Sequence, residues 1–370
     1  MSKINDFVVK FANVNGSGSA SANAMFAKSI FRMGIPVTPK NIFPSNIQGL
    51  PTWFEVRISK HGYAARREGI DCFITLNPQT YQTDVKEILP GGYLVYDNTM
   101  PRNFSRKDIN YIGIPMASIC AENYDDPRQR QLFKNIVCLG ALAALLKIDI
   151  KIIESLIKED FEKKPKLIPP NIKALYLGRD FALENLDCDL NVGLKKIRTT
   201  KKKILIQGNE AAGLGCVYGG ATVVGWYPIT PSTSLVEAFQ KYVNLFRVKD
   251  NGEVSAGIIQ AEDELAAVGM AIGANWNGAR AFTATSGPGI SLMSEFLGLA
   301  YFAEIPLVLF NIQRGGPSTG MPTRTQQSDI LSCAYASHGD TKHILLFPSD
   351  PKECFEMAAQ SFDLAEILQT

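Results

Sequence analysis

The sequence is poor in the residues that most often hold metals. It contains only three histidines, at positions 61, 338 and 343. Of its seven cysteines, the nearest two are Cys120 and Cys138, 18 positions apart, so there is no Cys-x-x-Cys pair. A zinc ribbon or an iron–sulfur cluster held by this chain alone is therefore excluded, and we expect no metal ligands in it. Any chemistry must rest on carboxylates, hydroxyls, arginines and a bound cofactor.

The sequence also lacks a long apolar run and an excess of charge. Its longest apolar stretch, from Cys138 to Leu146, is far shorter than the roughly 20 residues of a membrane span. Lysine and arginine number 38 against 36 aspartates and glutamates, so no field that attracts nucleic acid is expected. The N-terminal segment carries charges where a secretory signal needs an apolar core. These features predict a cytoplasmic protein without membrane or nucleic-acid partners.

The sequence does contain an α/β pattern that occurs twice. Its 370 residues are enough for about two to three domains. Strand-like and helix-like runs alternate over residues 1–190, which predicts a first α/β domain with a parallel sheet and helices on both faces. The lysine-rich stretch 160–202 is interpreted as a solvated linker. The pattern restarts over residues 203–370 and predicts a second, doubly wound parallel-sheet domain.

The second pattern ends on a helix-like run. An apolar strand is predicted at His343–Phe347, and a helical pattern follows at Lys352–Leu368. A β–α unit normally continues into another strand. We therefore expect a C-terminal remainder of this domain beyond residue 370.

A first loop rich in glycine and serine, residues 16–21, connects a predicted strand to a predicted helix. Its backbone N–H groups are suited to a phosphate at the helix N-terminus. Ser21 occupies the third glycine position of the dinucleotide fingerprint, so the loop departs from that motif. Two interpretations stay open: a tight turn, or a site for a nucleotide-like ligand such as coenzyme A.

A second loop, residues 227–234, contains two prolines and several hydroxyl side chains. Thr230 is predicted as a helix N-cap with Pro231 at the first helical position. Capping alone explains the pattern. A rigid loop at the carboxyl end of a strand is equally suited to hold a substrate carboxylate beside a helix N-terminus.

A third motif is a helix that opens with three carboxylates. Glu262 and Asp263 are explained by their favourable interaction with the helix dipole. Glu264 precedes a closely packed apolar face and is predicted to be buried at its mouth. The next strand ends in Thr-Ser-Gly-Pro-Gly at residues 285–289, where a flat ring can approach the backbone.

These motifs follow one another along the chain. The order is Tyr-Pro-Ile-Thr-Pro-Ser at 227–232, Glu264, Thr-Ser-Gly-Pro-Gly at 285–289, and Gln-Arg-Gly-Gly-Pro-Ser-Thr-Gly at 313–320. The set resembles the pyrimidine-binding domain in the α subunit of 2-oxoacid:ferredoxin oxidoreductases. Residues 1–190 are similar to the γ domain of that family, fused in front. The tract from Gly315 to Thr325 resembles the 2-oxoglutarate branch.

The resemblance implies thiamine diphosphate as the cofactor and an active site shared with a β subunit. It implies that Glu264 binds N1′ of the aminopyrimidine, and that Thr230 and Arg314 bind the substrate. It places Mg²⁺ and an iron–sulfur cluster on the β subunit, makes coenzyme A a cosubstrate and ferredoxin the electron acceptor, and implies an oligomer. The residues expected at the pyrimidine end of the cofactor are Tyr227, Pro228, Ile229, Ser286, Gly287 and Pro288, and those expected near coenzyme A are Ser17, Ser19, Ser45 and Asn46.

Other functions remain open. Pyruvate or a branched-chain 2-oxoacid is an alternative substrate, and basic groups such as Arg324 would distinguish it from 2-oxoglutarate. A non-catalytic module that only docks a β subunit is an alternative from a different class. A nicotinamide site in the first loop predicts an acidic residue about 20 positions further on. Residues 38–41 contain no Asp or Glu, which argues against it.

Overall fold

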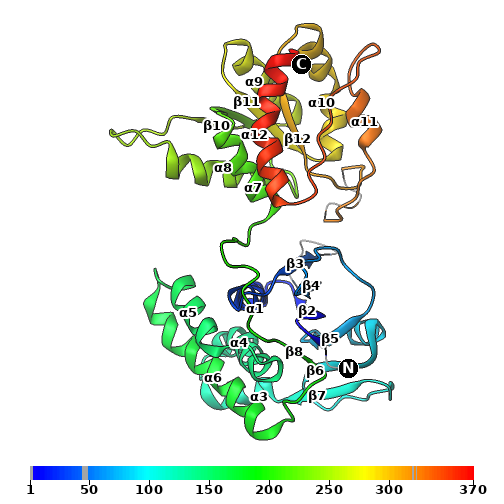
Figure 1. The fold of residues 1–370 in the computed structure, drawn as a ribbon, viewed down its shortest axis with the longest axis vertical. Helices are drawn as coiled ribbons and strands as arrows, with labels where there is room; N and C mark the ends of the chain where they lie inside the picture. The colour runs from blue at the N-terminus through cyan, green and yellow to red at the C-terminus, as the bar shows by residue number, and fades with distance from the viewer. Residues whose placement is uncertain (1–2, 44–48, 319–320, 322) are drawn as a thin grey trace. The chain divides into compact units, whose positions relative to one another are not determined.

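The computed structural model describes residues 3–43, 49–318, 321 and 323–370, and they form two compact units that divide between residues 205 and 206. Each unit contains its own sheet and its own hydrophobic core. Figure 1 shows the sheet and the helices of each unit.

The first unit is built on a six-stranded sheet of order β3-β4-β2-β5-β6-β7. β2, β5, β6 and β7 are parallel, whereas β4 pairs antiparallel with both β2 and β3. The all-parallel sheet expected from the sequence is thus wrong for this antiparallel edge. The strands are β1 (Lys3–Ile4), β2 (Asp6–Val14), β3 (Val37–Ile42), β4 (Pro51–Ser59), β5 (Ile70–Thr75), β6 (Ile88–Asp97), β7 (Asn110–Ile114) and β8 (Val192–Gly193).

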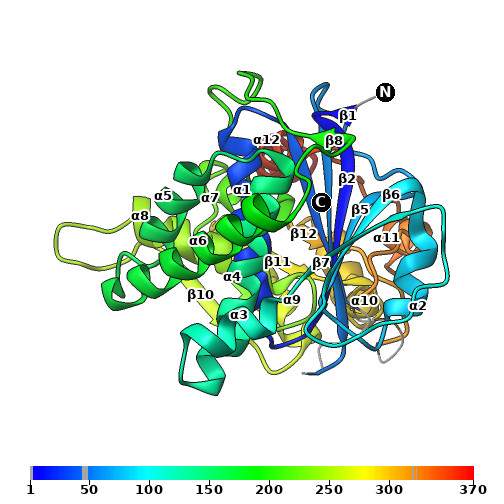
Figure 2. The same ribbon diagram turned by 90° about the horizontal axis from the view of Figure 1, so that it is seen from below.

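Long helices cover one face of this sheet (Figure 2). Alternate residues of β2, such as Phe7, Val9 and Phe11, face these helices and are buried. The opposite face packs under α2 and the aromatic residue Phe104. The helices are α1 (Ser19–Arg32), α2 (Tyr81–Asp84), α3 (Met116–Asn123), α4 (Pro127–Leu146), α5 (Ile150–Asp160) and α6 (Ile168–Asn185), with 3₁₀ turns η1 (Val85–Glu87) and η2 (Pro165–Leu167).

Residues 160–202 are an integral part of the first unit, so the prediction of a solvated linker is wrong. α6 buries Ala174, Leu175 and Ala182 in the core, because these residues recur on one face of the helix. After α6, β8 pairs with β1, and the amide of Ile197 donates to the carbonyl of Met33. The lysine runs lie at the ends of this stretch, so its overall composition conceals the apolar face of the helix between them.

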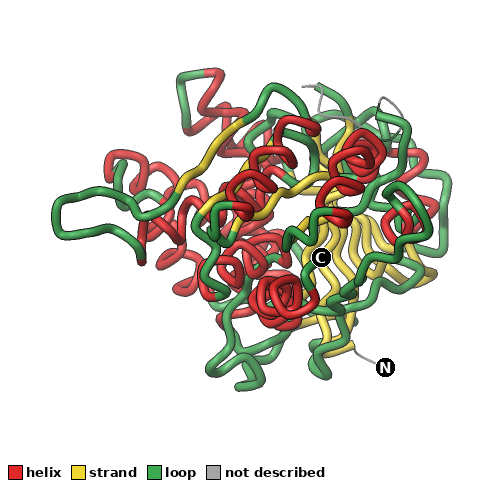
Figure 3. Tube along the Cα trace, turned by 90° about the horizontal axis from the view of Figure 1, so that it is seen from above, coloured by secondary structure: helices red, strands yellow, loops and turns green. Residues whose placement is uncertain are grey.

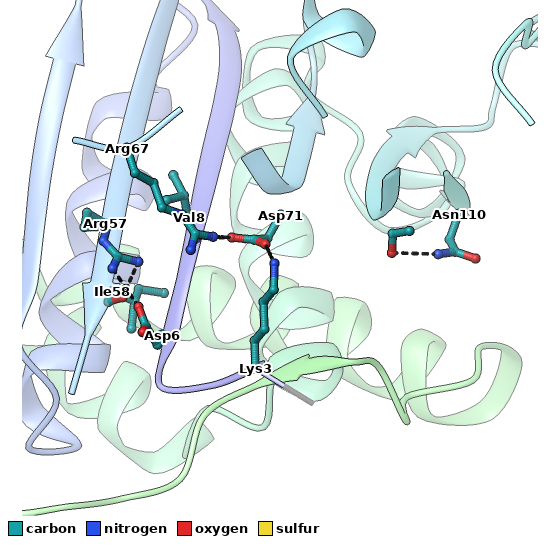
Figure 4. A network of polar contacts seen from close by, with 9 residues as sticks. Lys3, Asp6, Val8, Arg57, Ile58, Arg67, Asp71 and Asn110 are labelled. Atoms are coloured by element: carbon teal, nitrogen blue, oxygen red, sulfur yellow. Dashed lines mark hydrogen bonds and ion pairs between the residues drawn. The ribbon is translucent and has the colours of Figure 1, made fainter. Parts of the chain in front are cut away.

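A buried carboxylate, Asp71, fastens the N-terminal strands to this sheet (Figure 4). It accepts hydrogen bonds from the backbone amide of Val8 at 2.8 Å and from Lys3 Nζ at 2.5 Å, and it also pairs with Arg67. Each partner compensates part of the cost of burying the charge. Lys3 belongs to β1, so the network connects the β1–β8 pair to the main sheet.

α4 and α6 cross at two glycines. A Cβ atom at Gly178 would overlap the carbonyl oxygen of Val137, and one at Gly140 would overlap that of Leu175. Neither backbone can move without separating the helices. We therefore expect Gly178→Ala to destabilise the protein by about 1–3 kcal/mol through overpacking.

This prediction is checked by thermal unfolding followed by circular dichroism. Gly273→Ala is the matched control, because that helical glycine has open space around it, and the change should raise stability by up to about 1 kcal/mol. Equal unfolding temperatures for Gly178→Ala and the wild type would show that the helices do not need this close approach.

The second unit has a four-stranded, fully parallel sheet of order β10-β9-β11-β12, with helices on both faces. This confirms the doubly wound architecture expected from the sequence. α7, α8 and α12 cover one face, and α9 and α10 cover the other (Figures 1 and 3). The elements are α7 (Gly208–Tyr218), β9 (Val223–Trp226), α8 (Thr233–Phe246), β10 (Gly257–Gln260), α9 (Glu264–Trp276), β11 (Ala281–Thr285), α10 (Gly287–Phe302), β12 (Val308–Asn311), α11 (Ile330–Tyr335) and α12 (Pro351–Leu368).

The strand expected at residues 343–347 is not part of the sheet of the second unit, and these residues form no strand pairing. Residues 247–256 project as a long loop, closed by a bridge between Val248 and Val254 (Figure 3). No helix in the described part of the chain combines the length and the hydrophobicity that a membrane span requires.

Candidate active site

The candidate site lies at the carboxyl ends of the four parallel strands of the second unit. The loops that follow β9, β10, β11 and β12 lie at this edge. They lead to the residues predicted from the sequence at 227–232, at Glu264, at 285–289 and at Arg314. In open parallel sheets, ligands bind at this edge, because the loops there approach one another. The site is therefore built from loops on a rigid sheet.

Glu264 is a buried carboxylate at the first position of α9. Its exposed fraction is 8%, and in the described ranges it makes no hydrogen bond or ion pair. The neighbouring Asp263 acts as the helix cap, since its Oδ1 accepts from the amide of Ala266 at 2.7 Å. The side chain of Glu264 is thus mostly buried, but its carboxylate oxygens are not among the buried atoms that lack a partner. They remain available as acceptors for a ligand that donates a hydrogen bond.

The backbone at Gly289 packs closely against this carboxylate. A Cβ at position 289 would lie 2.9 Å from Glu264 Cγ and would overlap the hydroxyl of Thr285. The Thr285 hydroxyl is itself buried and has no partner in the described part of the chain. Glycine at 289 thus allows the first turn of α10 to pack directly against Glu264.

Arg314 lies on the loop after β12 and is 4% exposed. Its Nη1 donates to the carbonyl of Thr230 at 2.7 Å, and its Nη2 donates to the carbonyl of Ser318 at 2.9 Å. Its Nε is buried and has no acceptor among the described residues. Burial lowers the pKa of Arg314, and the negative charge of Glu264 acts in the opposite direction. Cation and carboxylate therefore belong to one electrostatic site.

Thr230 lies beside Arg314, but not in the role predicted for it as a helix cap. α8 begins at Thr233, and Ser232 precedes it. Ser232 is buried and its hydroxyl donates to the carbonyl of Ile229, so the local turn forms before the helix begins. Thr230 is exposed on that turn, and its carbonyl binds the guanidinium. The second proline therefore belongs to the turn and not to the first helical position.

The loop after β11 is joined to the loop after β12. The hydroxyl of Ser286 donates to the carbonyl of Ile312 at 2.7 Å. A Cβ at Gly287 would lie 3.0 Å from both the carbonyl oxygen of Arg314 and Oδ2 of Asp329. Pro288 occupies the first turn of α10. Ser286 and Gly287 thus belong to the Arg314 side of the site.

The remaining predicted residues are less closely connected to the site. Tyr227 is half-buried and Pro228 is exposed, and the Tyr227 hydroxyl makes no hydrogen bond in the described chain. The carbonyl of Ile229 is used by the turn at Ser232. Arg324 is exposed.

Sequence reasoning missed Asp329. This buried carboxylate accepts hydrogen bonds from Asn311 Nδ2 at 2.7 Å and from Gln313 Nε2 at 3.0 Å. Asn311 and Gln313 flank Ile312, so these two hydrogen bonds fix the segment that immediately precedes Arg314. An aspartate directly before a short helix was the available signal, because aspartate is a common N-cap.

We expect Asp329→Ala to lower the free energy of unfolding by about 1–3 kcal/mol, since two half-buried amide donors lose their buried acceptor. Chemical denaturation of the variant measures this loss. Asp340→Ala, at an exposed aspartate, is the control and should leave stability unchanged within about 0.5 kcal/mol. A loss of equal size in both variants would contradict a tethering role for Asp329.

In the first unit, the loop over residues 16–19 is a tight turn. Gly16 and Gly18 have positive φ angles of 83° and 76°, and the amide of Ser17 donates to the carbonyl of Val14. Asn135 Nδ2 donates to the carbonyl of Ser17 at 3.0 Å. Ser19 is buried at the start of α1. Ser45 and Asn46, also expected near coenzyme A, lie outside the described residues.

Comparison with known proteins identifies the family. Residues 8–181 match the model of the pyruvate ferredoxin/flavodoxin oxidoreductase domain, and residues 214–370 match that of the thiamine diP-binding domain of pyruvate flavodoxin/ferredoxin oxidoreductases. The chain is 30% identical to 2-oxoacid:ferredoxin oxidoreductase 2, subunit alpha, from Aeropyrum pernix, over 96% of this chain and 62% of that protein. It is 45% identical to the 2-oxoglutarate synthase subunit KorA of Methanothermobacter thermautotrophicus, over 45% of this chain and 42% of that protein.

One solved structure resembles the chain over 98% of its length. It is a 2-oxoglutarate:ferredoxin oxidoreductase from Magnetococcus marinus with 2-oxoglutarate, coenzyme A and succinyl-CoA bound, with a TM-score of 0.88 and 30% identity. The chain spans about three fifths of this protein and of the Aeropyrum pernix subunit. These comparisons confirm the resemblance stated from the sequence. The chain belongs to the 2-oxoacid:ferredoxin oxidoreductase family.

Proposed function

We propose that this chain acts as the α subunit of a 2-oxoacid:ferredoxin oxidoreductase. In this proposal, residues 203–370 bind the pyrimidine end of thiamine diphosphate and residues 1–190 form a γ-type domain. The observation that carries the proposal is the mostly buried side chain of Glu264, whose carboxylate has no hydrogen-bond partner among the described residues and lies at the carboxyl edge of a parallel sheet. A ring nitrogen that shares or donates a proton is the kind of partner this carboxylate lacks.

The residues present offer partners to such a ring. Glu264 has no hydrogen-bond partner among the described residues, and the buried hydroxyl of Thr285, close to it beside Gly289, has none either. Bound thiamine diphosphate supplies the acceptor for the electron pair that decarboxylation of the 2-oxoacid releases. Glu264 would hold a proton at the ring nitrogen of the bound cofactor.

Arg314 is proposed to bind the substrate carboxylate, with Thr230 beside it. The two hydrogen bonds to the Thr230 and Ser318 carbonyls fix the plane of the guanidinium. A planar, fixed guanidinium matches a planar carboxylate. The loop contacts made by Ser286 and Asp329 keep this group in place.

We propose 2-oxoglutarate as the substrate, with coenzyme A as the acyl acceptor and ferredoxin as the electron acceptor. Two relatives support this choice, because one is named a 2-oxoglutarate synthase subunit and the other has 2-oxoglutarate and coenzyme A bound. A β subunit is proposed to supply Mg²⁺ and the iron–sulfur cluster. Among the described residues of this chain, no three His, Cys, Asp or Glu side chains are grouped to hold a metal ion.

The test is an assay of the chain purified together with its β partner. With a viologen acceptor and coenzyme A, we expect 2-oxoglutarate to give a kcat/KM at least about tenfold above that for pyruvate, which corresponds to about 1.4 kcal/mol. A preference for pyruvate would overturn the substrate. Failure to bind thiamine diphosphate, with no turnover of any 2-oxoacid, would leave only the docking function and overturn the proposal as a whole.

A further inference from the structure

Two hydroxyl groups on β11 are buried without a hydrogen-bond partner in the described part of the chain. Thr283 and Thr285 are both 0% exposed, and the Oγ1 atom of each lacks a partner. Successive side chains of a strand point to opposite faces of a sheet. Phe282 and Ala284 belong to the core on the side of α7, α8 and α12, so the two hydroxyls lie on the side of α9 and α10. An unpaired hydroxyl in a closed interior is unfavourable.

The hydroxyl of Thr285 lies beside the side chain of Glu264. A Cβ atom at Gly289 would overlap Thr285 Oγ1 and would lie 2.9 Å from Glu264 Cγ, so both groups lie on the same side of this glycine. Glu264 makes no hydrogen bond or ion pair among the described residues. A hydroxyl can donate a hydrogen bond, and an ionised carboxylate can only accept one. Each of the two groups therefore lacks what the other supplies.

The hydroxyl of Thr285 is fixed, whereas the carboxylate of Glu264 can turn. Thr285 is the last residue of β11 and is in register with Asn311 of β12, and β-branched side chains have few rotamers. The side chain of Glu264 has three rotatable bonds, and its carboxylate oxygens are not among the buried atoms that lack a partner. Rotation of the carboxylate alone can thus bring it to the hydroxyl, without movement of either backbone.

We propose that Thr285 is a positioning residue for Glu264. Its hydroxyl donates a hydrogen bond to one carboxylate oxygen and leaves the other oxygen for the ring nitrogen of the cofactor. The part that concerns the ring nitrogen rests on the proposed function, whereas the contact between the two side chains does not. A hydrogen bond to an ionised carboxylate is short and strong, so it holds that group in one orientation. Thr285 acts on the reaction only through Glu264.

The first test is thermal unfolding of the 370-residue chain, without cofactor or β subunit. Valine replaces the hydroxyl of threonine by a methyl group of similar size. Thr283→Val removes a hydroxyl without a partner and should raise the unfolding temperature of the second unit by about 2–4 °C. Thr285→Val should instead lower it by about as much, because a bond to a charged group is lost. In a Glu264→Leu background no acceptor remains, and Thr285→Val should then raise it as Thr283→Val does.

The second test is steady-state turnover of the chain reconstituted with its β partner. Thr285→Val should lower kcat by about tenfold and leave KM within about twofold of the wild type, since the contact orients Glu264 and does not bind the substrate. Thr285→Ser keeps the hydroxyl and should retain kcat within about threefold of the wild type. Thr283→Val, at the other buried hydroxyl of β11, should change neither constant by more than about twofold.

Two outcomes would overturn the proposal. A higher unfolding temperature in Thr285→Val, with Glu264 in place, would show that the hydroxyl has no partner. Equal losses of kcat in Thr285→Val and Thr285→Ser would indicate a role in packing alone. A different result would count against the proposed function and support the contact: unfolding temperatures as expected in all variants, with no turnover of any 2-oxoacid in the wild type.

Discussion

Replacing Glu264 by glutamine should lower kcat of the reconstituted enzyme by about 10²–10⁴-fold, the range that positioned proton transfer contributes. Glutamine has almost the same shape, so the packing against Gly289 and the burial on α9 are kept. What is lost is the negative charge and the ability to hold a proton at the facing ring nitrogen. The measurement is steady-state turnover with a viologen acceptor at saturating thiamine diphosphate.

Glu262→Gln is the matched control, because Glu262 is exposed two positions earlier on the same loop. Its turnover should equal that of the wild type. Full activity in Glu264→Gln would remove the proposed role of this carboxylate. Equal losses in both variants would indicate a general effect of charge near the start of α9.

Replacing Arg314 by lysine should lower kcat/KM for the 2-oxoacid by about 10²-fold, or about 2.7 kcal/mol. Lysine keeps the charge but offers one ammonium in place of a planar fork. It cannot bond to the carbonyls of Thr230 and Ser318 and at the same time present a fixed donor pair to a carboxylate. The loss should appear mainly as a higher KM, since binding of the substrate is the step that requires the planar guanidinium.

Arg280→Lys is the control. Arg280 forms a bidentate ion pair with Glu366 and also donates a hydrogen bond to the carbonyl of Gly219. These contacts lie outside the candidate site. We expect kcat/KM in Arg280→Lys within about twofold of the wild type, as for a surface pair. An unchanged KM in Arg314→Lys would contradict direct contact between Arg314 and the substrate.

Part of the site could be anticipated from the sequence, because local patterns determine it. Ala267, Val268, Ala271 and Ile272 recur on one face of a helix, and the structure buries all four and Glu264 with them. The strand-to-helix loops could likewise be placed, since proline and glycine mark the ends of the strands.

What the sequence did not show depends on contacts between distant segments. Asp329 acquires its role only when β12 brings Asn311 and Gln313 beside it. The buried face of α6 could not be predicted from local composition, because lysine-rich segments flank the helix. It is recognised only from the packing of α6 against Gly140 of α4. Thr230 was misplaced because a Thr–Pro pair is compatible both with a helix cap and with the turn that precedes the helix.

The proposed contact of Glu264 with the ring nitrogen is tested most directly by the exchange of the C2 proton of bound thiamine diphosphate with deuterium, followed by NMR in the complex with the β subunit. This measurement needs no substrate, coenzyme A or ferredoxin. In Glu264→Gln the exchange should be slower than in the wild type by about 10²-fold or more, while Glu262→Gln should match the wild type. Exchange at the wild-type rate in Glu264→Gln, with the cofactor bound, would contradict the account.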